Sequence, residues 1–129
     1  MEKLRRSRVA VFGVGGVGGY AVEALARSGV GAIDIIDADC VDITNINRQV
    51  IALHSTIGKP KVDVCAARLR DINPQCRVTP IRQFYLPENA DATDLSAYDY
   101  VIDCIDTVSA KIELVRRCSE LGVPLICSM

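Results

Sequence analysis

A short apolar run that ends in a cluster of glycines constrains the fold of this chain more than any other feature. Residues 9–12, VAVF, are typical of a buried strand, and the glycine-rich stretch 13–19, GVGGVGG, follows directly. Apolar residues then recur at helical spacing until Gly29. A strand, a tight glycine turn and a helix in this order predict the beginning of a doubly wound α/β fold.

The rest of the chain continues the alternation of strands and helices. Strands are predicted at 32–37, 76–84, 98–105 and 124–129, and helices at 60–72 and 110–121. A short helix capped by Asn45 is expected to reach Leu53, and a loop or short helical turn is expected at 86–97. Pro80 lacks a backbone N–H, so its strand is expected at an edge or to be irregular. We therefore predict a doubly wound, mostly parallel, Rossmann-like sheet whose binding crevice lies at the carboxyl ends of the strands.

Length and charge limit what such a domain can do. With 129 residues, half of them hydrophobic, the chain can form one core, so residues 1–129 are predicted to be a single domain. The formal net charge of −1 provides no strong field for nucleic acid or for a membrane surface. No apolar run is long enough for a membrane span, and the first residues do not resemble a signal peptide. We expect a cytoplasmic protein without membrane contact and, because the chain ends directly after a strand, a fragment of a longer one.

The cysteines and the single histidine do not indicate a metal site. None of the six cysteines forms a CxxC pair, and several fall within apolar periods, so buried reduced thiols are favoured over disulfides or zinc. His54 has no second histidine or cysteine at a metal-ligand spacing, and we do not expect it to be a ligand.

The glycine turn itself indicates a phosphate. Gly13, Gly15 and Gly18 match GxGxxG between a strand and a helix, and Asp37 closes the next strand. Glycines allow backbone amides to approach a phosphate at a helix N-terminus, and a carboxylate can accept hydrogen bonds from ribose hydroxyls. The pattern does not distinguish a dinucleotide from a nucleoside triphosphate, and it is also compatible with tight strand-to-helix packing without a ligand.

Three charged residues favour a triphosphate, because a triphosphate under attack needs cations or Mg²⁺. Arg48 follows the second strand, and Lys61 lies in the first turn of a helix, where the helix dipole disfavours a cation by about 0.3–1 kcal/mol unless an anion is bound. Asp106 follows the strand at 98–105, where its carboxylate could hold Mg²⁺. These are the candidate catalytic residues. Alternatively they are a loop cation, a surface lysine and a helix cap.

Other polar residues near the same edge are each compatible with more than one role. Thr44 and Asn45 could donate hydrogen bonds to phosphates, although Asn45 could instead be a helix cap. Asp39, Asp42 and Asp103 cannot be assigned separate roles from the sequence, and Asp103 could be structural because it lies inside a strand run.

Four stretches resemble one known family. GVGGVG (13–18), DADCVDITNINRQ (37–49), GKPK (58–61) and DCID (103–106) are similar, in the same order, to motifs of the ThiF/MoeB/HesA adenylyltransferases, which are related to ubiquitin-activating enzymes. The resemblance implies a doubly wound sheet that binds Mg-ATP and adenylates a carboxylate with release of pyrophosphate, usually as a homodimer.

The resemblance also implies roles for individual residues. Gly16 would approach the phosphates, Asp37 the ribose and Asp106 the Mg²⁺ ion, and Asn45, Arg48 and Lys61 would bind the triphosphate. The complete set of expected nucleotide contacts is Gly13, Gly15, Gly16, Gly18, Asp37, Asp39, Thr44, Asn45, Arg48, Lys61 and Asp106.

Within the family the sequence most resembles the tRNA threonylcarbamoyladenosine dehydratases (TcdA, also called CsdL). The similarity lies in TNINRQ (44–49), FYLPENAD (84–91) and YVIDCIDTVSAK (100–111). It implies a tRNA partner, whose modified adenosine is activated at its carboxylate and then cyclised with loss of AMP. In sulfur-carrier activators an asparagine and an arginine typically stand at the positions of Thr107 and Lys111.

Three further functions are compatible with the sequence. The first is adenylation of the C-terminus of a ubiquitin-like sulfur-carrier protein. The second is an NAD-dependent oxidoreductase, which would account for GxGxxG and Asp37 but not for Arg48, Lys61 or Asp106. The third is a dimerising or scaffolding domain without catalysis.

Overall fold

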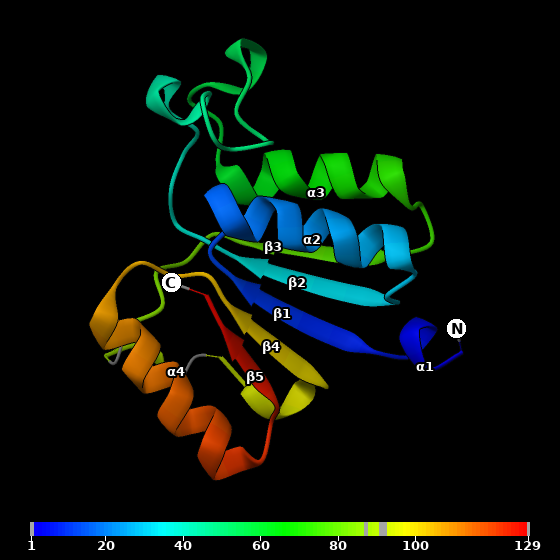
Figure 1. Ribbon diagram of the computed structural model, residues 1–129, viewed down its shortest axis with the longest axis vertical. Helices are drawn as coiled ribbons and strands as arrows, with labels where there is room; N and C mark the ends of the chain where they lie inside the picture. The colour runs from blue at the N-terminus through cyan, green and yellow to red at the C-terminus, as the bar shows by residue number, and fades with distance from the viewer. Residues whose placement is uncertain (1, 87, 91–92, 129) are drawn as a thin grey trace.

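The computed structural model describes residues 2–86, 88–90 and 93–128, which form a parallel five-stranded sheet with helices on both faces (Figure 1). The strands, β1 (Arg8–Phe12), β2 (Ala32–Ile36), β3 (Arg77–Ile81), β4 (Tyr100–Asp103) and β5 (Leu125–Cys127), lie in the order β3-β2-β1-β4-β5. The α-helices are α1 (Glu2–Arg5), α2 (Gly16–Ser28), α3 (Lys61–Ile72) and α4 (Val108–Leu121). This arrangement confirms the predicted doubly wound α/β fold.

The predicted strands are right in place, but four of the five are too long at their ends. The structure limits the strand predicted at 76–84 to β3, which is an edge strand, as Pro80 had indicated. The strands predicted at 98–105 and 124–129 shorten to β4 and β5, and Met129 lies outside the described residues. The segment at 86–97 contains the 3₁₀ helix η4 (Leu95–Ala97), and its residues 87, 91 and 92 are not described.

The helix predicted from Asn45 to Leu53 is wrong. The chain forms the 3₁₀ helix η1 (Ile43–Asn45), several turns, and a second 3₁₀ helix, η2 (His54–Thr56). Asp42, rather than Asn45, caps η1, since its carboxylate accepts a hydrogen bond from the Thr44 backbone, while Asn45 Oδ1 accepts one from the Asp42 N–H at 2.9 Å. These reciprocal hydrogen bonds close a single turn, and both side chains are used within that turn.

The sheet separates two apolar cores. On one face Val11, Ile33 and Ile35 pack with residues of α2 and α3, and on the other Phe12 and Ile36 pack with residues of α4 and of the segment before β4. Alternate residues of β1 and β2 therefore enter different cores, as expected for central strands covered on both faces. Each large aliphatic side chain buried in this way contributes about 1.5–3 kcal/mol.

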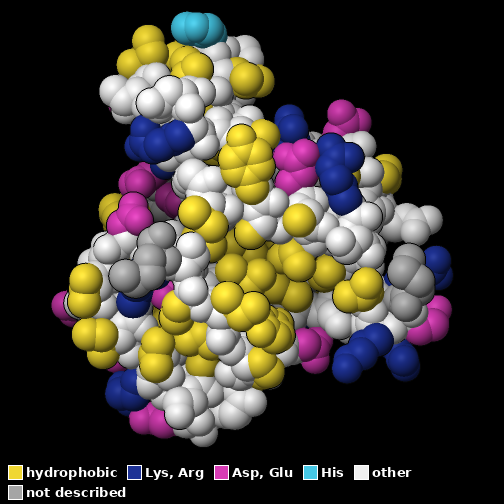
Figure 2. All heavy atoms as spheres, viewed as in Figure 1, with side chains coloured by type: hydrophobic (Ala, Val, Ile, Leu, Met, Phe, Trp, Pro, Cys, Tyr) yellow, Lys and Arg dark blue, Asp and Glu magenta, His cyan; other side chains and the backbone are white. Residues whose placement is uncertain are grey.

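One face of the molecule keeps a broad apolar surface. Figure 2 shows hydrophobic side chains gathered in the middle of the face turned to the viewer, between α2 and α4. The exposed large apolar side chains include Val17 and Tyr20 of α2, Ile126 of β5, and Val108 and Ile112 of α4. Contiguous apolar surface of this kind is typical of contacts with further protein.

Half of the cysteines are buried, in partial agreement with the expectation from sequence. All six cysteines are free, and Cys65, Cys76 and Cys118 are buried, whereas Cys127 is exposed. His54 is exposed, and within the described residues no three His, Cys, Asp or Glu side chains are grouped as a metal site would require. No helix in the described part of the chain is both long and apolar enough to cross a membrane.

Candidate nucleotide-binding site

A cavity of about 460 Å³ lies at the carboxyl edge of the sheet. Its walls come from the segments that follow the strands, and it opens where the strand order reverses between β1 and β4. Doubly wound sheets bind ligands at this position. The cavity brings together eight of the residues expected at the site: Gly13, Gly15, Gly16, Asp37, Asp39, Arg48, Lys61 and Asp106.

Two of the motif glycines are required by backbone packing. Gly13 has φ +91°, and a Cβ atom there would lie 2.6 Å from the carbonyl oxygen of Cys104. A Cβ atom on Gly18 would lie 1.7 Å from the carbonyl oxygen of Gly13. Any side chain at either position would therefore displace backbone that joins the turn, α2 and the end of β4.

Gly15 and Gly16 face more open space. The nearest atom to a Cβ on Gly15 would be Gln49 Nε2 at 3.5 Å, and on Gly16 it would be the Arg48 carbonyl oxygen at 3.9 Å. Helix α2 begins at Gly16 without a side-chain cap. Its first backbone N–H groups lack intrahelical partners and, together with the helix dipole, favour an anion at this point.

Asp37 organises the turn from the end of β2. Its Oδ2 accepts a hydrogen bond from the Val14 N–H at 2.9 Å, and its Oδ1 accepts one from the Asp39 N–H at 2.8 Å. A carboxylate oxygen can accept more than one hydrogen bond. Asp37 can therefore hold the glycine turn and still accept from a ligand hydroxyl, the role expected for it toward ribose.

Lys61 is a buried cation at the cavity. It is 6% exposed and begins α3, and its N–H donates to the Asp39 carbonyl at 2.9 Å. Among the described residues its ammonium group forms no ion pair, although its charge helps to lower the pKa of Asp42, for which the hydrogen bonds from Thr44 are the larger cause. A buried cation without a bonded counter-charge favours the binding of an anion.

Arg48 contributes a second cation from the loop after η1. Its Nη1 donates to the Thr44 carbonyl at 2.9 Å and to Asn47 Oδ1 at 3.2 Å. In the described part of the chain it has no carboxylate partner. The guanidinium is thus held by neutral acceptors at the cavity wall and keeps further N–H donors for an anionic ligand.

The structure separates the two aspartates of DCID. Asp103 is fully buried, and it accepts hydrogen bonds from Lys111 Nζ at 3.1 Å and from the Ile105 N–H at 2.9 Å. Lys111 also donates to the Ser128 carbonyl at 2.6 Å. Asp106 is exposed at the cavity and has no ion pair among the described residues. Asp103 therefore fixes the turn, and Asp106 is the carboxylate presented to a ligand or cation.

Three of the expected contacts do not line the cavity. Gly18 is buried inside α2, where it packs against the Gly13 backbone. Thr44 Oγ1 donates to Asp42 Oδ1 at 2.8 Å, and Asn45 is buried within the same capping pair. Direct roles of these residues in binding a nucleotide stay predictions, and their observed contacts are with the protein itself.

One wall of the cavity was not expected from the sequence. Gln83, Phe84, Tyr85 and Leu86 line it after β3, and Tyr85 meets the Phe12 ring edge to face at 5.0 Å. Burial raises the pKa of Tyr85 to about 12. The run FYL after an irregular strand was the only signal in the sequence, but apolar composition does not reveal that a loop folds back over the site.

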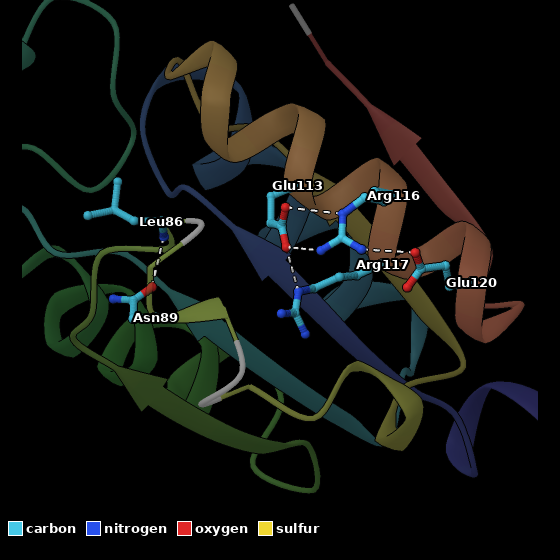
Figure 3. Close-up of polar contacts among 6 residues, drawn as sticks. All are labelled: Leu86, Asn89, Glu113, Arg116, Arg117 and Glu120. Carbon is cyan, nitrogen blue, oxygen red and sulfur yellow. Dashed lines mark hydrogen bonds and ion pairs between the residues drawn. The ribbon is translucent and has the colours of Figure 1, made fainter.

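Side-chain hydrogen bonds from one asparagine hold this wall. Asn89 Oδ1 accepts from the Leu86 N–H at 2.9 Å, and Asn89 Nδ2 donates to the Phe84 carbonyl at 2.7 Å. Figure 3 shows the first of these bonds and, across from it, the charged network of α4 in which Glu113 binds Arg116 and Arg117. Arg116 is the first cause of the lowered pKa of Glu113.

Gln49, Cys104, Thr107 and Ser128 also line the cavity without having been singled out as site residues. Burial is the first cause of the raised pKa of Cys104, so its thiol stays protonated near neutral pH and is a weak nucleophile. Gln49 was visible in the sequence as the neighbour of Arg48, but nothing in a single sequence shows that its side chain turns toward the glycines.

These residues suit a nucleotide with several phosphates. The cavity offers backbone amides at the start of a helix, two cations without carboxylate partners in the described part of the chain, and a carboxylate at the end of β2. Asp106 and Asp39, both exposed, are the carboxylates that could hold a cation jointly with the ligand. Mg²⁺ is usually bound in this way, through one or two carboxylates and substrate phosphates.

Comparison with known proteins gives matches along the whole chain. The ThiF family matches residues 1–129. A tRNA threonylcarbamoyladenosine dehydratase of Bacillus subtilis (strain 168) is 54% identical over 129 residues, which are 100% of this chain and 51% of that protein. A molybdopterin-synthase adenylyltransferase of Salmonella typhimurium is 37% identical over 125 residues, covering 97% of this chain and 50% of that protein.

A solved structure agrees with these matches. The Escherichia coli tRNA N6-threonylcarbamoyladenosine dehydratase TcdA, crystallised in complex with ATP, superposes with a TM-score of 0.91 at 43% identity, covering 98% of this chain and 52% of that one. The chain thus spans about half the length of the relatives it matches.

Proposed function

Because the chain belongs to the ThiF family, we propose that it binds ATP and takes part in ATP-dependent adenylation of a carboxylate. The observation that carries this proposal is the pair of cations, Lys61 and Arg48, which face one cavity with the glycine turn and have no carboxylate partner in the described part of the chain. The ATP complex of the E. coli relative supports the choice of nucleotide.

In the proposed reaction the residues of the chain position ATP and neutralise charge. A carboxylate oxygen of the substrate forms a bond to the α-phosphorus, the bond between the α-phosphorus and its bridging oxygen breaks, and pyrophosphate leaves. Lys61 and Arg48 stabilise the negative charge that develops on the phosphate oxygens, and the amides at Gly15 and Gly16 hold the phosphate chain. Asp37 accepts hydrogen bonds from the ribose.

We further propose that Asp106 binds Mg²⁺. When bound, the ion would polarise the phosphoryl oxygens and neutralise the departing pyrophosphate. The exposed position of Asp106 at the cavity supports this role, and so does the turn beneath it, which is fixed by the buried Asp103.

The proposed substrate is the carboxylate of threonylcarbamoyladenosine in tRNA, which would cyclise after activation with loss of AMP. The 54% identity to the B. subtilis dehydratase supports this choice over sulfur-carrier adenylation, for which the identity to the S. typhimurium adenylyltransferase is 37%. Thr107 and Lys111, which replace the asparagine and arginine typical of sulfur-carrier activators, favour the same choice.

An oxidoreductase or a scaffolding domain would account for fewer residues of the cavity. A dinucleotide-dependent oxidoreductase leaves the cations Arg48 and Lys61 and the carboxylate of Asp106 without a role. A scaffolding domain without catalysis leaves the whole cavity without one.

A homodimer in the cytoplasm is also part of the proposal. The exposed apolar side chains of α2, α4 and β5 support a contact with further protein, which could be a second copy. Six free cysteines support a reducing compartment. Sedimentation of the chain at several concentrations tests the dimer.

The ATP proposal is tested by nucleotide binding. Isothermal titration of the chain with ATP in the presence of Mg²⁺ should give saturable binding that is stronger than binding of NADH. Arg48→Ala and Asp106→Ala should each weaken it about 10-fold, and for Asp106→Ala the loss should disappear when Mg²⁺ is omitted. Tighter binding of NADH than of ATP would overturn the proposal.

The substrate is tested by reaction in the complete protein. Transfer RNA that carries threonylcarbamoyladenosine is incubated with enzyme and ATP, and the nucleosides are analysed by mass spectrometry. Loss of one water from the modified nucleoside, with release of AMP and pyrophosphate, is expected. Adenylation of a sulfur carrier without any change in the tRNA would favour the second candidate.

A further inference from the structure

Gln49 is a buried residue with an unpaired side-chain polar atom, and it lies at the cavity next to the glycine turn. Its side chain lines the cavity although the residue is only 7% exposed. Its Oε1 is buried and has no hydrogen-bond partner among the described residues. A phosphate offers no donor to this oxygen, but the carboxamide NH₂ group likewise forms no hydrogen bond among the described residues, so it is available to an acceptor that arrives with a ligand.

The position of the carboxamide relates it to the first turn of α2. Gln49 Nε2 lies 3.5 Å from the place that a Cβ on Gly15 would occupy, which is an ordinary contact distance, so the carboxamide lies directly beside Gly15. The loop is fixed behind it, because the backbone N–H of Gln49 donates to the Asn45 carbonyl at 2.9 Å. The carboxamide therefore stands beside the helix start at which an anion is favoured.

The chemistry of the group restricts what it can bind there. A carboxamide has an NH₂ donor and a carbonyl acceptor, and rotation by a half turn about its last bond exchanges the two. Fully ionised phosphate oxygens carry no proton, so they accept hydrogen bonds and donate none. A phosphate beside Gly15 would thus be bound through the NH₂ group in either starting orientation.

We propose that Gln49 is a further nucleotide-contacting residue, whose carboxamide NH₂ group donates to the phosphate chain beside Gly15 and Gly16. The inference rests on the proposed ATP binding and adds a neutral donor to the two cations. Because the donor carries no charge, it selects for the position of a phosphate oxygen rather than for negative charge in general.

The test separates binding from packing. Gln49→Met keeps the size of the side chain and removes both polar atoms. ATP affinity, measured by isothermal titration with Mg²⁺, should fall about 10- to 100-fold, as for loss of a hydrogen bond to a charged group. The melting temperature should stay the same or rise, because an unpaired buried polar atom has been removed. Gln75→Met, at an exposed turn outside the cavity, is the matched control and should change neither quantity.

Two further measurements keep the outcome decisive. Gln49→Glu preserves the shape but places a carboxylate beside the phosphates, and it should weaken ATP binding at least as much as Gln49→Met, even if the latter folds poorly. Adenosine, followed by competition, should bind Gln49→Met and the wild-type chain equally.

The possible results lead to different conclusions. Equal ATP affinity of the wild-type chain and a folded Gln49→Met variant overturns the inference and leaves the proposed function intact. Equal weakening of adenosine and ATP overturns the phosphate contact. No binding of ATP by the wild-type chain overturns the proposed function and the inference with it.

Discussion

A paired carboxylate near the amino-terminal end of the strands contrasts with two cations at their carboxyl end. At the amino-terminal side, Arg8 forms an ion pair with the buried Asp34 at 2.7 Å, and the same carboxylate accepts a hydrogen bond from the Tyr98 hydroxyl at 2.7 Å. The Arg8 guanidinium also lies 5.0 Å from the centre of the Tyr98 ring. At the carboxyl side, Lys61 and Arg48 have no carboxylate partner within the described residues.

The charge of Asp34 contributes to the stability of the fold, whereas the charges of Lys61 and Arg48 are left for a ligand. A buried carboxylate that is paired and hydrogen-bonded, like Asp34, contributes to one packing arrangement and is not accessible to a ligand. A buried cation without a counter-charge, such as Lys61, is destabilising unless an anion binds. Substitutions at the two ends should therefore separate stability from nucleotide affinity.

The largest expected effect would break the carboxyl end itself. Gly18→Ala puts a Cβ atom 1.7 Å from the Gly13 carbonyl oxygen, so backbone must move and the free energy of unfolding should fall by more than about 3 kcal/mol. Denaturant titration followed by circular dichroism measures the loss.

Gly16→Ala is the matched variant for this comparison, because the added Cβ atom would have the Arg48 carbonyl oxygen as its nearest neighbour, at 3.9 Å. It should keep or slightly raise stability, by up to about 1 kcal/mol, because alanine favours helix. Similar destabilisation by both variants would show that the two glycines do not divide into a packing glycine and a cavity glycine.

The next effect concerns the amino-terminal end. Arg8→Met leaves the buried Asp34 without its cation and should lower the free energy of unfolding by about 3 kcal/mol, with ATP affinity unchanged in the folded fraction. Chemical denaturation and ATP titration measure the two quantities.

Arg77→Met is the control, because Arg77 also begins a strand and is exposed, but has no ion pair in the described part of the chain. It should change stability by less than about 0.5 kcal/mol. A weakened ATP affinity in folded Arg8→Met would contradict the division between the two ends.

Lys61→Met should lower ATP affinity without lowering stability, which is the opposite of the result expected for Arg8→Met. ATP affinity should fall about 30-fold, or about 2 kcal/mol, because a charge-assisted contact to phosphate is lost. Stability without ATP should stay the same or rise, since an unpaired buried cation has been removed. Titration calorimetry and thermal melting measure the two effects.

Lys59→Met serves as its control, because Lys59 lies two positions earlier in the same GKPK stretch and is exposed. It should leave ATP affinity within about 2-fold of the wild-type value. Loss of stability without loss of affinity in Lys61→Met would mean that Lys61 belongs to the fold rather than to the ligand.

The smallest effect is a pH dependence at the amino-terminal end. Burial, followed by the hydrogen bond to Asp34, raises the pKa of Tyr98 above the ordinary value of 10.0. A raised pKa contributes stability that is fully present below pH 10 and is lost as the pH rises through the folded-state value. At about pH 9 the free energy of unfolding of the wild-type chain should exceed that of Tyr98→Phe by about 1 kcal/mol. This difference should shrink above pH 10.

Denaturant titrations between about pH 8 and pH 11 measure this difference. Tyr20→Phe is the control, because Tyr20 is 58% exposed, and its effect should stay near zero at every pH. A constant difference between wild type and Tyr98→Phe would contradict the contribution of the buried hydroxyl.

The sequence predicted the fold well because its signals are local. Apolar runs, the glycine turn and the proline in β3 act within a few residues, and they were sufficient for the order of elements and for the edge position of β3. The error at Asn45 arose within the same local reasoning, since Asp42, three residues earlier, competes for the capping role and closes a 3₁₀ turn instead of opening a helix.

The candidate site was predictable only in part. Since parallel strands direct their carboxyl ends to one edge, Asp37, Arg48 and Asp106 could be expected together, and they line one cavity with Lys61. The wall at 83–86 could not be predicted, because the direction in which a loop folds back depends on contacts such as those of Asn89 and of Tyr85 with Phe12.

Periodicity and chain order along the sequence specify a doubly wound parallel sheet with a glycine turn at a phosphate-binding edge, because they define which strand ends meet. Which groups at that edge are already paired is visible only in the folded chain. Gly18 serves packing, Asp103 forms a buried ion pair, and Lys61 and Gln49 line a cavity in which their side chains have no polar partner among the described residues. The physical reason is that pairing depends on distances between residues far apart in the chain, which spacing along the chain does not encode.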